Sequence, residues 1–469
     1  MTNQAPITNE QWLGAYFVIR SFEIDSSFII YHSSFSFLGK IICMVLAARE
    51  MRICLVAQNA SLKFGGEASL PWLCFKYLRQ RGVDVHLVAH GRTRQEVLAG
   101  FPGDADRLHF APETRTDRLL WRMGSWLPGK IDAQTFGTAR HVFNQMLQRR
   151  IVRRLIAGRG IQLVHEMTPV SPKQLSLMYG LGVPVLIGPL AGGMTYPPAF
   201  SYLEPRGARA VEAAGRALAH TLNRILPGKR DAAGLIVAND QARAALPRGV
   251  RGKIFHIPDV GVDLRVWDQP GEPPKPQGGR IRLVYLGRLA DWKGVAFLLE
   301  AMASVVKRAD CVLEILGDGE ERGALEAQVG RLNLSDRVTF CGWVTADQAA
   351  RRLGGADIFV MPSLHEVGGI AILEAMAAGL PVIVTDWGGP AVHVSEDCGI
   401  RVRPDSRDGF VAGLADAVLR LAQSPDLRHR MGQAGRRRVA ANLYDWNQKI
   451  DSLLEIYAQL IEDAARTCN

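Results

Sequence analysis

Residues 365–389 read HEVGGIAILEAMAAGLPVIVTDWGG, and this stretch decides the fold. It places two glutamates eight positions apart, Glu366 before a glycine pair and Glu374 inside an apolar run. Gly368 and Gly369 precede a segment of helical length that a glycine and a proline close. The apolar run PVIVTD then predicts a buried strand. A loop, a helix and a buried strand in this order are typical of one unit of a parallel α/β sheet.

The same alternation extends in both directions from this stretch. Short apolar runs begin at Met51 (ICLVA, VDVHLVAH, QLVHEM, VPVLIGP, GLIVAN) and again at Ile281 (IRLVYLG, CVLEILG, RVTFCG, DIFVMP). Helix-length segments separate them, which indicates βα units. Residues 266–280 are rich in proline and glycine and read as a linker. The sequence therefore predicts an α/β protein with two Rossmann-like domains that face each other across a cleft, with ligands at the carboxyl ends of the strands.

These patterns also set the domain boundaries that we expect. Residues 51–265 form the amino-terminal Rossmann-like domain and residues 281–441 the carboxyl-terminal one. Residues 442–469 carry apolar residues near helical spacing, and we expect a helix that packs back toward the amino-terminal domain. Within residues 1–50, the segment 28–48 is mostly apolar, but a histidine, serines and a lysine interrupt it. We expect a poorly ordered extension there, with a membrane anchor as the alternative.

The composition narrows the class of protein. With 469 residues, 48% hydrophobic and 22% charged, the chain is of ordinary globular composition, neither disordered nor fibrous. A net charge of +10 favours an anionic partner, which is nucleic acid, an acidic lipid surface or a phosphorylated substrate. The seven cysteines are scattered, without a CxxC pair. Neither a disulfide framework nor a zinc site is indicated, and a reducing, cytoplasmic compartment fits best.

Two cations follow the first strand of the carboxyl-terminal half. In YLGRLADWKGV, Gly287 ends the strand, and Arg288 and Lys293 lie in the loop after it. A guanidinium grips phosphate oxygens bidentately and an ammonium adds a compact charge, so the pair suits a diphosphate. The alternative is a pair of solvated loop cations.

The next strand runs into VLEILGDGEER, which contains Gly317 and Gly319. A dinucleotide fingerprint needs a third glycine where Arg322 stands, so the motif predicts only a tight strand-to-helix turn beside the ligand. The sequence also lacks GxxxxGK[ST], and a P-loop phosphotransferase is unsupported.

Residues 365–389 contain groups that can bind an anion and sugar hydroxyls. Gly368 and Gly369 leave backbone N–H groups free at the start of a helix, which is a natural anion site. Carboxylates accept hydrogen bonds from paired hydroxyls, so Glu366 and Glu374 suit a hexose and a ribose on either side of a phosphate. The alternative is that Glu374 faces water, although a carboxylate in so apolar a run needs partners.

Two motifs in the amino-terminal half add weaker candidates. KFGGEAS places Gly65 and Gly66 after the first strand, in a turn that can approach phosphate from the opposite wall. His165 lies at another strand end and is a candidate for contacting the reacting sugar, with a satisfied structural histidine as the alternative. HLVAH lacks the glutamate of HExxH, so no metal site is expected.

Residues 139–160 hold six arginines and no acid. Phe143, Leu147, Ile151 and Leu155 fall four apart, so that we expect one face to enter the core while the arginines lie opposite. Such a basic amphipathic helix can rest on an anionic membrane. A solvated face over a buried stripe is the alternative.

Together these motifs resemble a known family. GRLADWKG, LGDGEER, RVTFCGW, ADIFVMPS and the E-x7-E spacing before GGP are similar, in this order, to the carboxyl-terminal domain of glycosyltransferase family 4. The resemblance covers 281–402 closely and the amino-terminal half more loosely, through KFGGEAS and VHEMTPVSP. It implies a GT-B fold, an amino-terminal acceptor domain, a carboxyl-terminal donor domain, and transfer from a nucleotide-diphosphate sugar with retention of configuration and without a metal or other cofactor.

The resemblance also implies roles for single residues. The catalytic residues that it implies are Arg288, Lys293, Glu366 and His165. The donor-binding residues that it implies are Gly65, Gly66, Gly287, Gly317, Gly368, Gly369 and Glu374. Arg288 and Lys293 would hold the diphosphate, Glu366 the sugar and Glu374 the ribose. Val367 and Gly368 stand where the family often has glycine and phenylalanine, which would reshape the sugar pocket.

We therefore expect a retaining hexosyltransferase that acts on a glycan or lipid-linked glycan in polysaccharide or lipopolysaccharide synthesis. Its partners would be the nucleotide-sugar donor and this acceptor. We also expect peripheral contact with the cytoplasmic face of an anionic membrane, and no binding of nucleic acid. Two alternatives stay open: a sugar-nucleotide epimerase of similar fold, and a non-enzymatic protein that binds nucleotide sugars.

Overall fold

The computed structural model describes most of the chain from Glu50 onwards. The described residues are 50–63, 66–126, 132, 135–192, 194–204, 221–223, 225–267 and 279–468, all in the structural unit Ala48–Asn469. The expected extension before Glu50, most of the expected linker at 266–280, and Gly65 lie outside them. None of the helices formed by the described residues has the length and apolar character needed to cross a bilayer.

The amino-terminal half is built on a seven-stranded parallel sheet in the order β3-β2-β1-β4-β5-β6-β7. Three of its seven strands are buried along their whole length, because helices cover both faces of such a sheet. The strands are β1 (Arg52–Val56), β2 (Asp84–His90), β3 (Leu108–Ala111), β4 (Leu163–Glu166), β5 (Val185–Leu190), β6 (Gly234–Val237) and β7 (Lys253–His256).

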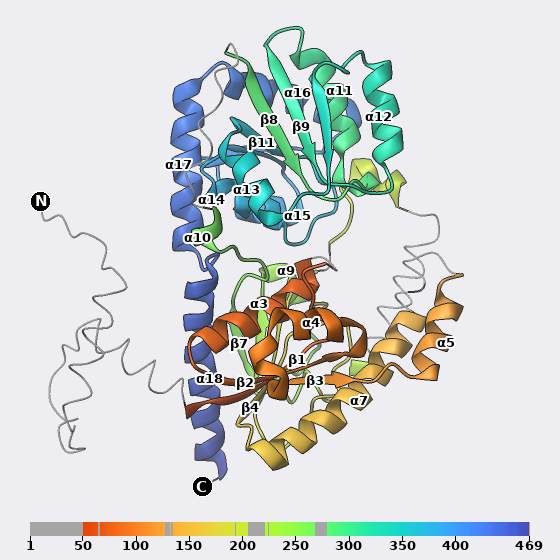
Figure 1. Ribbon diagram of the computed structural model, residues 1–469, viewed down its shortest axis with the longest axis vertical. Coiled ribbons are helices and arrows are strands. Elements are labelled where there is room, and N and C mark those ends of the chain that lie inside the picture. Colours follow the sequence, from red (N-terminus) through yellow and green to blue (C-terminus); the bar gives the residue numbers. More distant parts are fainter. Residues whose placement is uncertain are drawn as a thin grey trace, which may run out of the picture. The chain divides into compact units, whose positions relative to one another are not determined.

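The carboxyl-terminal half is built on a six-stranded parallel sheet in the order β10-β9-β8-β11-β12-β13. The two sheets confirm the predicted fold class (Figure 1). The strands are β8 (Ile281–Leu286), β9 (Cys311–Leu316), β10 (Val338–Gly342), β11 (Ile358–Met361), β12 (Val382–Thr385) and β13 (Gly399–Val402).

Helices connect the strands, and local sequence signals begin several of them. The Thr345 side chain accepts a hydrogen bond from the Gln348 N–H, and the Gln348 side chain accepts one from the Thr345 N–H, which is a capping box. The α-helices are α3 (Gly66–Gln80), α4 (Arg94–Gly100), α5 (Arg115–Gly124), α7 (Phe136–Arg159), α9 (Asp240–Ala244), α10 (Leu264–Trp267), α11 (Val295–Val305), α12 (Arg322–Arg331), α13 (Ala346–Gly354), α14 (Ile370–Ala377), α15 (Gly388–His393), α16 (Arg407–Ala422), α17 (Pro425–Ala441) and α18 (Trp446–Cys468).

Each sheet has a point at which the strand order reverses. In the second sheet, β8 lies between β9 and β11, so the chain leaves β8 to one side and later returns on the other. Loops that follow the carboxyl ends of β8 and β11 therefore diverge around a shared space, where open α/β sheets bind ligands. Lys293 follows β8 and Glu366 follows β11, so the topology alone brings these two residues together.

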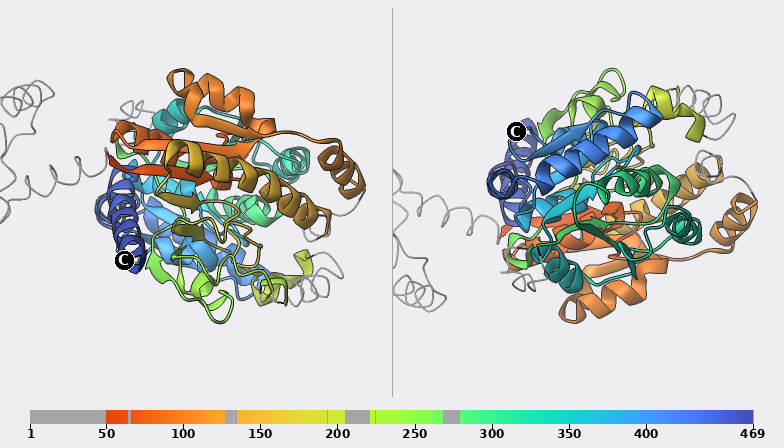
Figure 2. Two further views of the ribbon diagram at one scale, coloured as in Figure 1. Left: turned by 90° about the horizontal axis from the view of Figure 1, so that it is seen from below. Right: turned by 90° about the horizontal axis from the view of Figure 1, so that it is seen from above.

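The last helix, α18, packs against the first sheet although it follows the second one in sequence. Ile450, Leu453 and Tyr457 are buried in the same apolar cluster as residues of β1 and α3. The chain enters α18 beside the segment that leaves β7, through an isolated bridge between Val262 and Asp445. Figures 1 and 2 show α18 in blue beside the elements of the amino-terminal half.

The arginine-rich segment forms α7, but its buried face differs from the one that we predicted. Phe143 and Leu147 are only partly buried, and the buried positions are His141, Asn144, Gln145, Gln148, Val152 and Leu155. Four of these six positions are polar, and two of the four meet backbone carbonyls. Gln148 Nε2 donates to the Ala57 carbonyl at 2.7 Å, and a His141 ring nitrogen lies 2.9 Å from the Leu175 carbonyl oxygen.

Candidate active site

The loop after β8 holds the first half of the candidate site. A 3-10 turn, η5 (Asp291–Lys293), ends at Gly294, which adopts a left-handed φ of 69°. A side chain at Gly294 would place its Cβ 2.2 Å from the Pro362 carbonyl oxygen. The backbone at Gly294 therefore lies close to the end of β11. A hydrogen bond of 2.8 Å from the Leu364 N–H to the Trp292 carbonyl fixes the η5 turn there.

The loop after β11 supplies Glu366, which pairs with Lys293. Lys293 Nζ donates a hydrogen bond to Glu366 Oε2, and each side chain is 15% exposed. The second carboxylate oxygen accepts a hydrogen bond of 3.2 Å from the Gly369 N–H. The Glu366 carbonyl accepts another, of 3.0 Å, from the Gly389 N–H. Three hydrogen bonds therefore hold Glu366 in place, and Lys293 binds one of its two carboxylate oxygens.

The glycine pair after Glu366 begins α14. Gly369 is the N-cap and has a left-handed φ of 68°, which favours glycine. A side chain at Gly368 would place its Cβ 2.5 Å from Val260 Cγ1, so this position also excludes larger residues. The two glycines let the backbone turn sharply between Glu366 and the helix, whose first N–H groups have no partner within the helix.

Glu374 lies one turn into α14 and is partly buried. Burial raises the pKa of its carboxyl to about 7. No hydrogen bond or ion pair engages that carboxyl within the described part of the chain. A carboxyl that is desolvated and unpartnered is destabilising in the empty protein and gains from a ligand that donates to it.

Arg288 is placed differently from Lys293, although both follow β8. Its side chain is 64% exposed and forms an ion pair of 3.0 Å with Glu320. The neighbouring glycines pack closely, because a side chain at Gly317 would place its Cβ 1.9 Å from the Gly287 carbonyl oxygen. Gly287 and Gly317 thus allow the two turns to touch, and Arg288 projects outward from them.

Gly66 connects the amino-terminal half to this site. A Cβ at Gly66 would lie 3.1 Å from Ile370 Cδ1, so the first residue of α3 meets the first residue of α14. The structure therefore brings Gly66 beside the glycine pair that precedes α14.

His165 is separated from this group of residues. It is fully buried at the end of β4, where its Nδ1 lies 2.7 Å from the Tyr457 hydroxyl and its Nε2 lies 2.8 Å from the Gly188 carbonyl oxygen. Burial lowers the pKa of His165 to about 4, so the ring is neutral at pH 7. Both nitrogens are engaged and none is offered to a ligand. The geometry is that of a structural histidine, and we leave His165 out of the proposed site.

The glycine-rich loop after β5 contacts the site from the amino-terminal half. Trp387 Nε1 donates to the Thr195 carbonyl at 2.7 Å, and the rings of Tyr196 and His365 lie 5.1 Å apart. Because His365 and Trp387 lie near the two ends of residues 365–389, this loop lies against the segment that carries Glu366. Its signal in the sequence is its glycine content, in GPLAGGMTYPPAF.

Asp259, in the segment after β7, is a second residue that sequence reasoning missed. Burial raises the pKa of its carboxyl, and the negative charge of Glu366 adds to the shift, whereas the ammonium of Lys449 opposes it. Lys449 Nζ itself donates to the Pro258 carbonyl at 2.8 Å. Its signal in the sequence is an acid three residues after the end of a strand, in HIPDVGVD.

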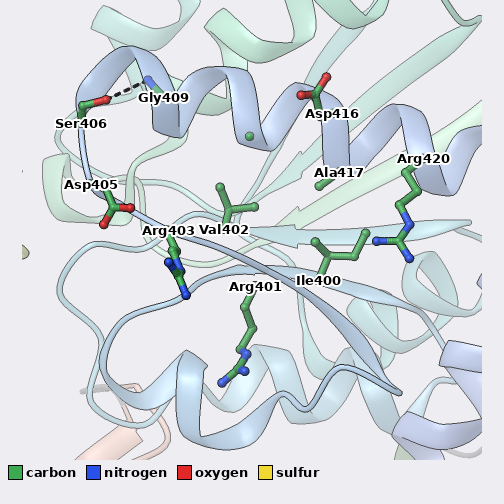
Figure 3. Close-up of a pocket in the computed structure, with 11 residues that line it drawn as sticks. Ile400, Arg401, Val402, Arg403, Asp405, Ser406, Gly409, Asp416, Ala417 and Arg420 are labelled. Carbon is green, nitrogen blue, oxygen red and sulfur yellow. Dashed lines mark hydrogen bonds between the residues drawn. The ribbon is translucent and has the colours of Figure 1, made fainter.

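Over the described residues, no group of three or more histidine, cysteine, aspartate and glutamate side chains is placed to hold a metal ion. Figure 3 shows a groove of about 430 Å³ between β13 and α16, lined by Arg401, Arg403 and Arg420 among others. β13 is an edge strand of the sheet, so this groove lies at the sheet edge, and it contains none of the expected donor residues.

Comparison with known proteins gives the family. The family of glycosyl transferases group 1 matches residues 270–438. Alpha-D-kanosaminyltransferase from Streptomyces kanamyceticus is 34% identical over 179 residues, which is 38% of this chain and 45% of the relative. The lipopolysaccharide core biosynthesis glycosyltransferase LpsE from Rhizobium meliloti is 31% identical over 203 residues, 43% of this chain and 54% of the relative. The chain thus spans about half the length of these curated relatives.

Solved structures match over more of the chain. Sucrose-phosphate synthase from Thermosynechococcus elongatus aligns with a TM-score of 0.62 at 21% identity, covering 88% of this chain and 100% of that one. Anabaena HepE in complex with UDP and glucose aligns with a TM-score of 0.56 at 17% identity, covering 87% and 100%. Residues 270–438 therefore form a domain of the group 1 glycosyl transferases, which are glycosyltransferase family 4, and the two sheets of the chain have the GT-B fold.

Proposed function

We propose that this protein transfers a hexose from a nucleotide-diphosphate sugar to a hydroxyl of a glycan or lipid-linked glycan, with retention of configuration and without a metal. The observation that carries the proposal is the Lys293–Glu366 pair at the strand-order reversal of the second sheet, beside the first N–H groups of α14. Structural relatives support the donor class, since Anabaena HepE has been solved in complex with UDP-glucose.

In the proposed complex the diphosphate lies between Lys293 and the start of α14. When the bond between the anomeric carbon and the phosphate oxygen breaks, its electron pair stays with the departing diphosphate. An ammonium has three donors, so Lys293 can keep its bond to Glu366 and still donate to that oxygen. Fixed donors that face a developing charge are worth about 2.7–4 kcal/mol each in known enzymes.

Arg288 has to leave Glu320 and bind the diphosphate before it can assist cleavage of the sugar–phosphate bond. Its pair with Glu320 is exposed to water, and such pairs contribute about 1 kcal/mol at most. A diphosphate carries more charge than one carboxylate, so exchange is favourable once the donor is bound. We propose that Arg288 closes on the diphosphate after binding, whereas Lys293 is already in position.

The two glutamates then bracket the donor. Glu366 has one oxygen on Lys293 and the other on an N–H group, and its remaining acceptor capacity suits sugar hydroxyls. Glu374 lies further along α14, and its unpartnered carboxyl suits the paired hydroxyls of the ribose.

A screen of nucleotide sugars tests the proposal. Purified protein is incubated with UDP-, GDP- and ADP-sugars, thermal stabilisation is measured, and products are analysed with and without added glycan acceptors. We expect at least one nucleotide sugar to raise the melting temperature and to be consumed faster when an acceptor is present. An epimerised donor formed without acceptor would instead identify an epimerase, and binding without turnover would identify a sensor; either result would overturn the proposal.

We also propose a peripheral position on the cytoplasmic face of a membrane, where lipid-linked acceptors for polysaccharide or lipopolysaccharide synthesis lie. The relative LpsE, named for lipopolysaccharide core biosynthesis, supports this class of acceptor. Arg150, Arg153 and Arg154 are exposed on α7. Arg149 is committed elsewhere, because it donates to the Leu177 carbonyl and its guanidinium lies 4.7 Å from the centre of the Tyr179 ring.

Changing Arg150, Arg153 and Arg154 to glutamine is therefore expected to weaken binding to anionic liposomes, since each basic residue near such a surface contributes about 1 kcal/mol. Sedimentation with anionic and neutral liposomes at low and raised salt measures the effect, and nucleotide-sugar affinity should stay unchanged. If the wild-type protein does not sediment with anionic liposomes even at low salt, α7 presents only a solvated face and the membrane proposal fails.

A further inference from the structure

The amino-terminal half contains a hollow of about 420 Å³ that the proposed donor site does not use. It lies where β1, β2 and β3 end, beneath α5 and α7, which pack side by side (Figure 1). We call it the arginine hollow after the residues in its wall: Arg92, Arg118, Arg122 and Arg140. No residue expected to bind the donor lines it.

The charges in the wall are only partly compensated. Asp117 lies 3.1 Å from His90 Nε2, and Arg140 forms an ion pair of 2.7 Å with Asp132. Arg118 and Arg122, one turn apart on α5, are exposed and have no ion-pair partner among the described residues. The hollow therefore presents two unpaired guanidiniums, which favour an anion.

Asn144 is a second and independent indication of a ligand. Its side chain lines the hollow and is 4% exposed, yet neither its Oδ1 nor its Nδ2 has a hydrogen-bond partner. A buried amide without partners costs free energy, and native proteins keep such groups where something else satisfies them. Asn144 offers one acceptor and one amino group, which suit a hydroxyl or an oxyanion.

The remaining wall suits a sugar ring. Trp121 lines the hollow and is 61% exposed, so a flat apolar face is available for the C–H groups of a pyranose. Glu113 lies at the rim after β3 and can accept hydrogen bonds from hydroxyls. The hollow thus combines donors for an oxyanion with a flat wall and hydroxyl acceptors.

We propose that the arginine hollow binds a sugar that carries an oxyanion, a phosphate or a carboxylate, and that this sugar is part of the acceptor. The acceptor role rests on the proposed function, whereas binding itself does not. Arg118 and Arg122 bind the anionic group. Asn144 forms hydrogen bonds with a neighbouring hydroxyl of the sugar, and Trp121 packs against the sugar ring. The acceptor is then an acidic or phosphorylated glycan and not a neutral one.

Calorimetric titration tests the proposal on the full chain, with UDP or GDP present to fill the donor-phosphate site. The probes are glucose 6-phosphate, glucuronic acid and glucose. We expect one or both anionic sugars to bind at least about tenfold more tightly than glucose, as expected for hydrogen bonds between charged groups. Tighter binding of glucose 6-phosphate assigns a phosphate, and tighter binding of glucuronic acid assigns a carboxylate.

Variants connect the binding to the hollow. Arg118→Gln with Arg122→Gln is expected to lower the affinity for the preferred anionic sugar by about tenfold or more. The matched control is Arg430→Gln with Arg437→Gln, two exposed arginines of α17, which should leave that affinity unchanged. Asn144→Leu should weaken binding while leaving the melting temperature equal or higher, because it removes an unsatisfied buried amide; a purely structural role would lower the melting temperature.

Two results would overturn the proposal: glucose binding as tightly as the anionic sugars, or the Arg118 and Arg122 double variant keeping the wild-type affinity. These outcomes are distinguishable from failure of the proposed function. A protein that ignores every nucleotide sugar can still bind glucose 6-phosphate at the arginine hollow. Conversely, a transferase that consumes a nucleotide sugar but shows no preference for anionic sugars would keep its function and lose this site.

Discussion

Replacing Lys293 by alanine is expected to lower kcat for sugar transfer by about a hundredfold or more, because one donor to the leaving group is lost. The Lys293 side chain is 15% exposed, so little water competes for the charge that develops on the diphosphate. The interaction is made mainly in the transition state, and kcat should therefore fall more than KM rises. Steady-state kinetics with the donor found in the nucleotide-sugar screen measure both quantities.

Two controls accompany this variant. Lys307→Ala removes an exposed lysine from the same half of the protein and should leave kcat unchanged. Lys293→Ala also leaves Glu366 without its cation, so Lys293→Ala combined with Glu366→Gln separates loss of the donor from an unpaired carboxylate. If the Lys293→Ala protein melts like the wild type and keeps its kcat, Lys293 does not face the leaving group.

Glu374→Gln is expected to weaken binding of the nucleoside diphosphate by about tenfold to a hundredfold, because a charged acceptor for two hydroxyls is lost. Burial raises the pKa of Glu374 to about 7. Only the ionised form accepts from both hydroxyls, so wild-type affinity should rise as the pH increases from 6 to 8, while the affinity of the variant stays flat. Calorimetric titrations across this range measure the difference.

The same carboxyl has the opposite effect on the empty protein. The pKa of Glu374 is raised from 4.5 to about 7, so the folded state binds more protons than the unfolded state between these values. The free energy of unfolding should therefore decline as the pH rises through this window, and Glu374→Gln should lessen the decline. Urea unfolding from pH 5 to pH 8 tests this, with Glu455→Gln, an exposed glutamate of α18, as control. Identical slopes for wild type and Glu374→Gln would contradict the assignment.

Much of the fold and part of the site could be predicted because their signals are local. Apolar runs bounded by glycine and proline identified strands in both sheets, since each buried parallel strand needs such a run. Lys293 and Glu366 are 73 residues apart, yet their meeting follows from topology. Loops that leave neighbouring strands of a parallel sheet share one edge, and the strand order then decides which loops meet.

What could not be predicted depends on partners distant in sequence. His165 lies at a strand end, as a catalytic histidine often does, but its ring is held by Tyr457, 292 residues further along the chain. The face of α7 was misread for a similar reason. Gln148 donates to the Ala57 carbonyl, 91 residues earlier, and no periodicity in the helix reveals that a polar side chain is needed there.

The return of α18 to the first sheet has a consequence for recombination between members of the family. The amino-terminal half is discontinuous in sequence, since its apolar cluster is completed by Ile450, Leu453 and Tyr457. An exchange of donor specificity by swapping everything after Ile281 would replace these three contacts along with the donor loops. The exchanged segment should instead end before Trp446, where α18 begins, so that the chimera keeps the complete acceptor half. Such a chimera has two junctions, whereas a simple fusion has one.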